Sequence, residues 1–227
     1  MKRKISTEFA YVAGLLLIAC GVSLMERADY GVSMVVAPAY LLYRWLSPMW
    51  SFVTFGMAEY CLQAVLLLLM MLLIRRFRVS FLFSFVTAVI YGFVLDGFMA
   101  LTGMLPAAAI WCRLLYYVLG MILCAAGVSA MFHTYISPEV YELFVKEVSA
   151  HFHVNITRFK TIYDIVSCLM GVIMSFLIFG FLRFEGVKWG TVVCALINGW
   201  IIGRFSVFFD RHWEFYDRFP LRRFFEK

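Results

Sequence analysis

The sequence predicts an all-α, polytopic membrane protein with six transmembrane helices. Apolar residues make up 64% of the 227 residues and charged residues 15%, against about 45–50% and about 25% in soluble domains. The apolar residues form six runs long enough to cross a bilayer, which takes about 20 residues. Lysine and arginine concentrate on one side of these runs. A chain of this size could not hide so much apolar surface in one soluble core.

The six expected spans share a nearly unbroken apolar composition. They are Phe9–Met25, Ser51–Ile74, Ser80–Met104, Trp111–Phe132, Thr161–Leu182 and Trp189–Phe209. A further apolar run, Gly31–Tyr43, is short and contains Pro38. We expect the segment Gly31–Ser47 to be either re-entrant or interfacial, because a run of that length does not span. After Pro138, the acidic and basic residues are typical of an amphipathic surface helix.

The distribution of positive charge predicts the orientation. If the N-terminus is inside and all six runs cross, fourteen lysines and arginines lie in inner segments and five in outer segments. This bias predicts that both termini are cytoplasmic. It also explains the net charge of +6 without a nucleic-acid partner. The tail, residues 210–227, alternates basic and aromatic residues, which is typical of a cytoplasmic segment at the lipid headgroup layer.

The single membrane domain, residues 1–227, contains a weak internal repeat. Gly21-Val22-Ser23 recurs as Gly127-Val128-Ser129, and residues 91–98 resemble residues 198–205. The two copies cover about residues 9–104 and 111–209, each with three spans and one short non-spanning segment. Because three is odd, the second copy must cross the membrane in the opposite sense. Inverted repeats of this kind are typical of secondary transporters.

These motifs, in this order, resemble the YczE/YyaS/YitT group of bacterial membrane proteins. The resemblance extends over about residues 9 to 209 and includes Gly21-Val22-Ser23, Tyr30-Gly31-Val32-Ser33, Arg75-Arg76-Phe77-Arg78, Gly92–Asp96 and Ser137-Pro138-Glu139. One departure is Met34, where the group has proline. The resemblance implies a location in the bacterial cell (inner) membrane. It implies no substrate, because the group has no established biochemical activity.

Two carboxylates in the outer half of the spans are candidates for substrate or ion binding. Charged groups within spans cost about 2.5–3.5 kcal/mol on insertion scales and are functional candidates. Glu59 and Asp96 lie at similar depth, and Ser33 in the short segment could reach them. Two adjacent carboxylates would share a proton or a cation. The alternative is that each is separately hydrogen-bonded to backbone or water.

Asp164 and Arg204 lie on the inner side of two other spans. We expect them to form a buried ion pair, which lets both stay in the membrane. The alternative is an inner gate.

The function predicted from these features is transport of a small, unidentified solute. The alternative is a membrane binding subunit or scaffold for a partner protein, such as the substrate-capture component of a modular importer. A homo-oligomer is compatible with both. No enzyme motif, such as a P-loop or HExxH, occurs in the sequence, and the six cysteines form no CxxC pair. We therefore expect neither an enzyme nor a metal or cofactor site.

Overall fold

The computed structural model describes residues 3–136, 139–180 and 186–219. Within these ranges the chain forms eight helices and two short strands. Their bounds are β1 (Arg3–Ser6), α1 (Thr7–Ala28), α2 (Ala37–Leu46), α3 (Phe55–Ile74), α4 (Val79–Gly103), α5 (Ile110–Phe132), α6 (Val140–His151), α7 (Ile156–Phe179), α8 (Trp189–His212) and β2 (Trp213–Tyr216).

Six of these helices confirm the six expected spans. α1, α3, α4, α5, α7 and α8 each have between 20 and 25 residues and are apolar enough to cross a membrane. At a rise of about 1.5 Å per residue they are about 30–37 Å long, which matches a hydrocarbon core of about 30 Å. The protein is therefore an all-α, multi-pass membrane protein.

Local signals explain where several helices begin and end. The side chains of Ser6 and Thr54 cap α1 and α3 by accepting hydrogen bonds from backbone N–H groups in the first turn, at 3.3 and 3.1 Å. Asp29 and Arg75 end the same helices in the left-handed conformation, with φ of 58° and 52°. Such caps satisfy backbone groups that the helix itself cannot.

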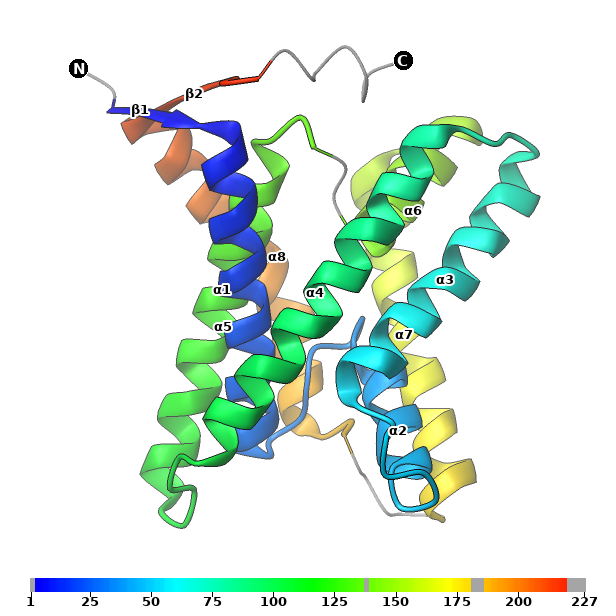
Figure 1. Cartoon of the computed structure of the whole chain (residues 1–227), viewed down its shortest axis with the longest axis vertical. Helices are drawn as coiled ribbons and strands as arrows, with labels where there is room; N and C mark the ends of the chain where they lie inside the picture. The colour runs from blue at the N-terminus through cyan, green and yellow to red at the C-terminus, as the bar shows by residue number, and fades with distance from the viewer. Residues whose placement is uncertain (1–2, 137–138, 181–185, 220–227) are drawn as a thin grey trace.

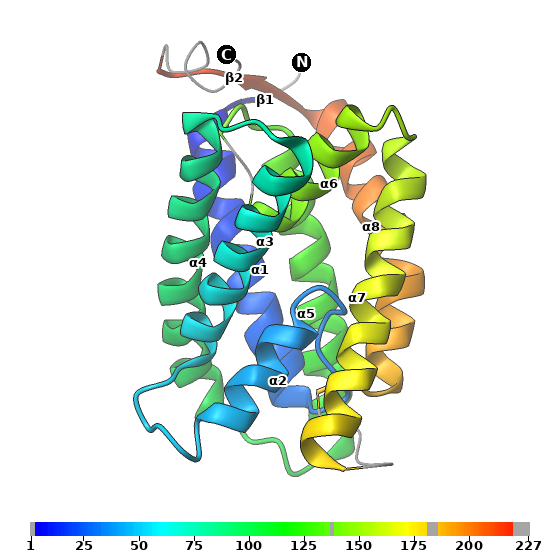
Figure 2. The ribbon, with the colours of Figure 1, turned by 90° about the vertical axis from the view of Figure 1, so that its right-hand side faces the viewer.

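The order long, short, long, long occurs twice along the chain, in α1–α4 and in α5–α8. Figure 1 shows the short helix α2 near one end of the bundle and α6 near the other. We call the end that carries β1 and β2 the strand end and the opposite end the far end. The loop before α2 rises from the far end towards the middle, and α2 returns to the far end (Figures 1 and 2). Residues 31–47 thus double back within the bundle, as a re-entrant segment does.

Most helix contacts in the first half have an equivalent in the second half. α1 packs on α4 as α5 packs on α8, α2 packs on α3 as α6 packs on α7, and α3 packs on α6 as α2 packs on α7. One pair differs. α3 packs closely along α4, whereas α7 and α8 have few contacts and lie well apart in Figure 1.

α1 and α5 form the central seam of the bundle, and four glycines let them approach closely. A Cβ atom at Gly21 would lie 2.6 Å from the carbonyl oxygen of Gly120, and one at Gly127 would lie 2.6 Å from that of Gly14. These distances are shorter than any side chain tolerates, so only glycine fits. Small residues are the usual means by which membrane helices pack backbone to backbone.

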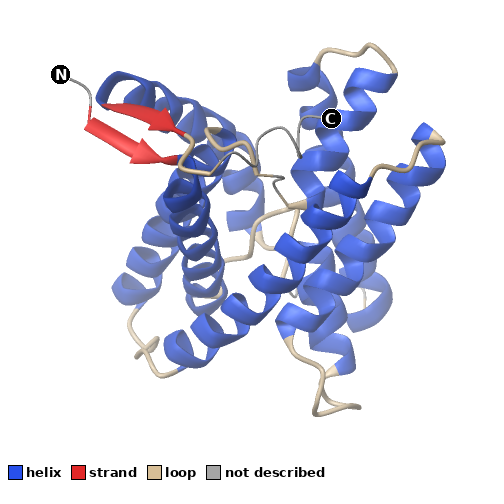
Figure 3. Ribbon diagram, turned by 45° about the horizontal axis from the view of Figure 1, so that its top comes forward, coloured by secondary structure: helices blue, strands red, loops and turns tan. Residues whose placement is uncertain are grey.

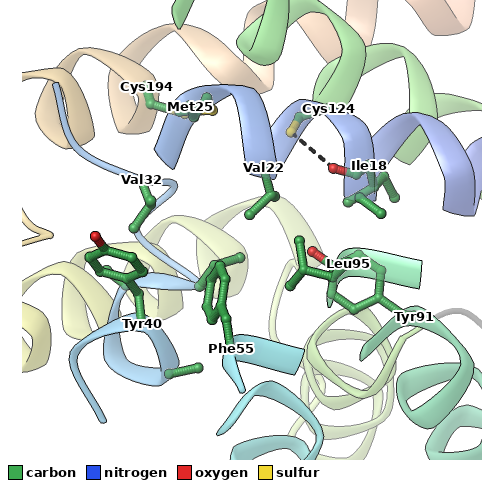
Figure 4. Close-up of a cluster of buried hydrophobic side chains, with 14 of the residues drawn as sticks. Ile18, Val22, Met25, Val32, Tyr40, Phe55, Tyr91, Leu95, Cys124 and Cys194 are labelled. Atoms are coloured by element: carbon green, nitrogen blue, oxygen red, sulfur yellow. Dashed lines mark hydrogen bonds between the residues drawn. The ribbon is translucent and has the colours of Figure 1, made fainter. Parts of the chain in front are cut away.

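The apolar core lies beside this seam. Figure 4 shows Val22 and Met25 of α1 with Tyr91 and Leu95 of α4, and with Phe55 at the start of α3. All five side chains are at most 2% exposed. The core therefore joins the α1–α5 seam to α4 and to the first turn of α3.

The two strands were not predicted. β1 and β2 pair in parallel, so that Arg3 lies opposite Trp213 and Ser6 opposite Tyr216, and they lie across the helix ends (Figure 3). Glu8 strengthens this junction by accepting hydrogen bonds from the backbone N–H groups of Arg218 and Phe219 at 3.0–3.3 Å. The first part of the tail predicted for residues 210–227 is thus tied to the start of the chain, and residues 220–227 lie outside the described ranges.

Candidate binding cavity

A cavity of about 100 Å³, the central cavity, lies where the two halves of the chain meet. Residues separated by 106 or 107 positions line it in pairs. The pairs are Ile18 with Cys124, Val22 with Val128, and Tyr91 with Asn198. Residues 33–36 before α2, and Glu139 with Tyr141 at the start of α6, complete the wall. Equivalent elements of both halves therefore build this cavity.

A larger hollow of about 960 Å³, the side hollow, opens between α7 and α8. It shares Glu142, Lys160, Asp164 and Gly199 with the central cavity. Its walls along the two helices are mostly aliphatic and include Ile165, Leu169, Val192 and Leu196. The side hollow therefore leads to the central cavity. Charged side chains line it where the two join, and aliphatic side chains line the rest.

Buried polar atoms without partners gather at the central cavity. Eight buried side-chain N or O atoms of the described residues have no hydrogen-bond partner, and five of them belong to residues that line this cavity. The five are the hydroxyl of Tyr91, Oε1 of Glu139, Oδ1 of Asn198, the hydroxyl of Tyr141, which faces Glu59, and Oδ1 of Asp164, which lies 3.8 Å from the ammonium group of Lys160. Each such atom costs about 1–3 kcal/mol when it stays unpaired, and native proteins contain few of them. A bound polar molecule would satisfy them.

Glu59 belongs to a buried carboxyl pair with Glu139. The amide nitrogen of Gln63 lies 3.4 Å from Oε1 of Glu59 and 3.4 Å from Oε2 of Glu139, and Oε1 of Gln63 accepts a hydrogen bond from the backbone of Val140 at 3.1 Å. Glu59 is 0% and Glu139 8% exposed. Burial, and then the charge of Glu142, raises the pKa of Glu139 to about 8. Two buried carboxylates repel each other, so the pair favours holding a proton over ionising both groups.

Asp96 does not join Glu59. Its Oδ2 accepts a hydrogen bond from Thr54 at 2.6 Å, and its Oδ1 accepts one from the backbone N–H of Gly56 at 2.8 Å. Asp96 thus fastens α4 to the first turn of α3, where the helix dipole favours a negative charge. This is the separately hydrogen-bonded alternative of the sequence analysis. Ser33 lies apart from Asp96 and lines the central cavity.

Asp164 and Arg204 do not form the expected ion pair. Oδ1 of Asp164 lies 3.8 Å from the ammonium group of Lys160, which also donates a hydrogen bond to Glu142 at 2.9 Å. The guanidinium group of Arg204 instead lies over the ring of Trp200, 5.3 Å from its centroid, on the exposed side of α8. The physical reason is the separation of α7 and α8, which leaves the two side chains on different faces.

The far end of the cavity is closed by hydrogen bonds and ion pairs. Lys188 Nζ lies 2.5 Å and Arg113 Nη2 3.1 Å from the carboxylate of Asp29. The backbone N–H of Gly190 donates a hydrogen bond to the carbonyl of Tyr30 at 3.0 Å. These contacts join the end of α1 to the starts of α5 and α8, so the cavity is closed on this side.

Most residues of this site were not predicted from the sequence. The residues after Pro138 were expected to form an amphipathic helix on the inner side, whereas Glu139 is buried and lines the cavity. One signal could have identified Glu139. Glu139 lies 104 positions after Val35. The predicted repeat therefore places it two residues after Ser137, the equivalent of the candidate binding residue Ser33. Lys160 also had a signal, because it lies four positions before Asp164 and could face it on one helix. Gln63 had none.

Comparison with known proteins gives a family but no characterised relative. A family model described as "Family of unknown function (DUF6198)" matches residues 5–207. No curated protein and no solved structure matches the chain. The name of the family does not link it to the YczE/YyaS/YitT group, so that resemblance stays a prediction.

Proposed function

The chain belongs to the DUF6198 family of unknown function, and we propose that it is a membrane transporter that exposes its central cavity alternately at the two ends of the bundle. The part of the solute that the central cavity holds is small, because this cavity has a volume of about 100 Å³. On the predicted topology the strand end faces the cytoplasm and the far end faces outward.

One observation carries the proposal. The cavity collects five buried polar atoms that have no protein hydrogen-bond partner of normal geometry, at the place where equivalent residues of the two halves face each other. Transporters with inverted repeats hold their substrate near the middle of the membrane at the interface of the repeats. A structural core at this position would be filled with apolar side chains rather than with unsatisfied polar groups.

The glycine seam supports an inverted relation between the halves. Gly14 and Gly120 are equivalent positions, as are Gly21 and Gly127, because each pair is 106 residues apart. The contacts join Gly14 to Gly127 and Gly21 to Gly120. Contacts that exchange equivalent positions in this way are the signature of two-fold symmetry.

The difference between the halves supports movement. Gly92 of α4 lies against Gly56, where a Cβ on Gly56 would meet the carbonyl of Gly92 at 2.1 Å. Gly199, the equivalent position in α8, has nothing within 4 Å of a built Cβ and lines the side hollow. The α3–α4 seam is thus closed and the α7–α8 seam open. If the α7–α8 seam closed and the α3–α4 seam opened, the cavity would become accessible from the opposite end of the bundle.

Asp96 gives a reason for the closed seam. It fastens α4 to α3, whereas Gly203 stands 107 positions later and carries no side chain that could fasten α8 to α7. The α7–α8 seam therefore opens at lower cost in free energy.

Cysteine accessibility tests the proposal. The six native cysteines are replaced by serine, and Val128→Cys is introduced in the cavity wall. Membrane-impermeant thiol reagents are then applied to vesicles of each orientation. Met104→Cys and His151→Cys, exposed at the far end and the strand end, are the controls and react from one side each. Alternating access predicts that the cavity cysteine reacts from both sides.

Reaction of the cavity cysteine from one side only would contradict the proposal. That result, with a partner protein co-purifying in stoichiometric amount, would favour the alternative, a membrane binding subunit.

A further inference from the structure

The charges around the cavity are strongly unbalanced. Among the described residues that line the central cavity, Glu139, Glu142 and Asp164 are acidic and Lys160 is basic. Glu59 adds a fourth carboxyl directly behind Glu139. Lys160 is already engaged by Glu142 and Asp164 at 2.9 and 3.8 Å. Unbalanced carboxylates away from water are costly unless a proton or a cation neutralises them.

The unpartnered atoms at the cavity favour a cation as its ligand. Oε1 of Glu139 and Oδ1 of Asp164 lack a hydrogen-bond partner, and a positively charged group would interact favourably with both. Tyr91 and Tyr141 add two aromatic rings to the same wall. Aromatic rings attract organic cations through the negative potential of the ring face.

The side hollow fits the remainder of such a ligand. It continues from Lys160 and Asp164 along aliphatic walls formed by Ile165 and Leu169 of α7 and by Val192 and Leu196 of α8. An apolar group attached to the cation would lie against these walls and gain about 25 cal/mol for each Å² of apolar surface removed from water. A bare metal ion would use none of this surface.

We propose that the solute is an amphipathic organic cation, with its charged group at Glu139 and its apolar part in the side hollow, and that it exchanges for a proton held by the Glu59–Glu139 pair. This inference rests on the transport function proposed above. When the cation enters, the carboxyl group of Glu139 releases its proton to solvent, and when the cation leaves, the carboxylate takes a proton back. The charge in the cavity is the same before and after, so neither state leaves the carboxylate uncompensated.

The surroundings of Glu139 are consistent with this exchange. Burial and the charge of Glu142 raise its pKa to about 8, so it is mostly protonated at neutral pH when the cavity is empty. The titratable groups that face it come from every helix packed around it. They are Tyr11 of α1, Glu59 of α3, Tyr91 of α4, Cys124 of α5, Tyr141 and Glu142 of α6, and Lys160 and Asp164 of α7. The one positive charge among them, Lys160, is held by Glu142 and Asp164.

Calorimetry on the purified full chain in nanodiscs tests the inference. The probes are benzyltrimethylammonium as the cation, N-benzylacetamide as a neutral molecule and phenylacetate as an anion. Titration in two buffers of different ionisation enthalpy counts the protons released. We expect the cation to bind, with about one proton released per cation near pH 6.5 and far less near pH 9.5.

Two variants make the result specific. Glu139→Gln keeps the shape and removes the charge, and we expect cation affinity to fall at least about tenfold and proton release to disappear. Glu147→Gln is the matched control on helix α6. The carboxylate of Glu147 lies 3.9 Å from the guanidinium group of Arg78, and Glu147 does not line the cavity. This variant should behave as the unmodified protein does.

The remaining outcomes overturn the inference and also separate it from the proposed function. Binding of N-benzylacetamide or phenylacetate in place of the cation would refute the substrate class. Cation binding without proton release, or release that persists in Glu139→Gln, would refute the exchange. No binding by any probe would refute the organic-cation site, and if the cavity cysteine still reacts from both sides, the transporter proposal stands.

Discussion

Replacing Gly21 by alanine tests the central seam. A Cβ atom at this position would lie 2.6 Å from the carbonyl oxygen of Gly120, against 3.4 Å for ordinary contact. The helices must therefore separate by about 0.8 Å, because a helical carbonyl cannot rotate away. Overpacking of this kind costs about 1–3 kcal/mol, and lost contacts along the seam add to it at about 0.1–0.2 kcal/mol each. The higher helix propensity of alanine offsets at most about 1 kcal/mol of this loss in the free energy of unfolding.

We therefore expect Gly21→Ala to lower the free energy of unfolding by about 2 kcal/mol. The measurement is unfolding in mixed micelles with increasing dodecyl sulfate, followed by circular dichroism. Gly97→Ala is the control, because this glycine of α4 is exposed and has nothing within 4 Å of a built Cβ. It should be neutral or stabilising by up to about 1 kcal/mol.

Gly14→Ala should have an intermediate effect, because its Cβ would lie 2.9 Å from the carbonyl of Gly127. Equal stability of Gly21→Ala and Gly97→Ala would show that the seam is not tight. The argument for two-fold packing of α1 on α5 would then fail.

Three further predictions concern the two chain termini, the α3–α4 seam and the Glu59–Glu139 pair. Reporter fusions at residue 227 and near Pro106 should lie on opposite sides of the membrane, and agreement between them would refute the six-span topology. Asp96→Ala removes the hydrogen bonds that join α4 to the start of α3. It should therefore raise the rate at which the cavity cysteine is labelled from the far end severalfold. An unchanged labelling rate would show that Asp96 does not hold the α3–α4 seam closed. Glu139 keeps its proton up to about pH 8 when folded and has an ordinary value of 4.5. The folded state therefore binds more protons in this window, and stability should fall as pH rises from about 4.5 to about 8. Glu139→Gln should flatten this part of the profile, and an unchanged slope in thermal unfolding would contradict the assignment.

The residues selected from the sequence have other partners in the structure than those expected. Glu59 was expected beside Asp96, and the structure places it beside Glu139 through Gln63. Asp164 was expected beside Arg204, and it lies beside Lys160. Depth along a helix follows from the rise per residue. Which partner a side chain meets depends on the rotation of its helix and on the separation between helices, which composition does not contain.

The amino-acid sequence is enough to predict a membrane protein with six spanning helices, because the length and polarity of an apolar run decide whether it can span a bilayer. The nearly constant spacing of similar motifs also predicts an internal repeat. The packed helices, in contrast, are needed to see that the α3–α4 seam is closed and the α7–α8 seam open, and that Glu139 lines the cavity. These features arise from contacts between segments far apart in the chain, such as Gln63 with Val140 and Asp96 with Gly56. Such contacts exist only after the helices have packed.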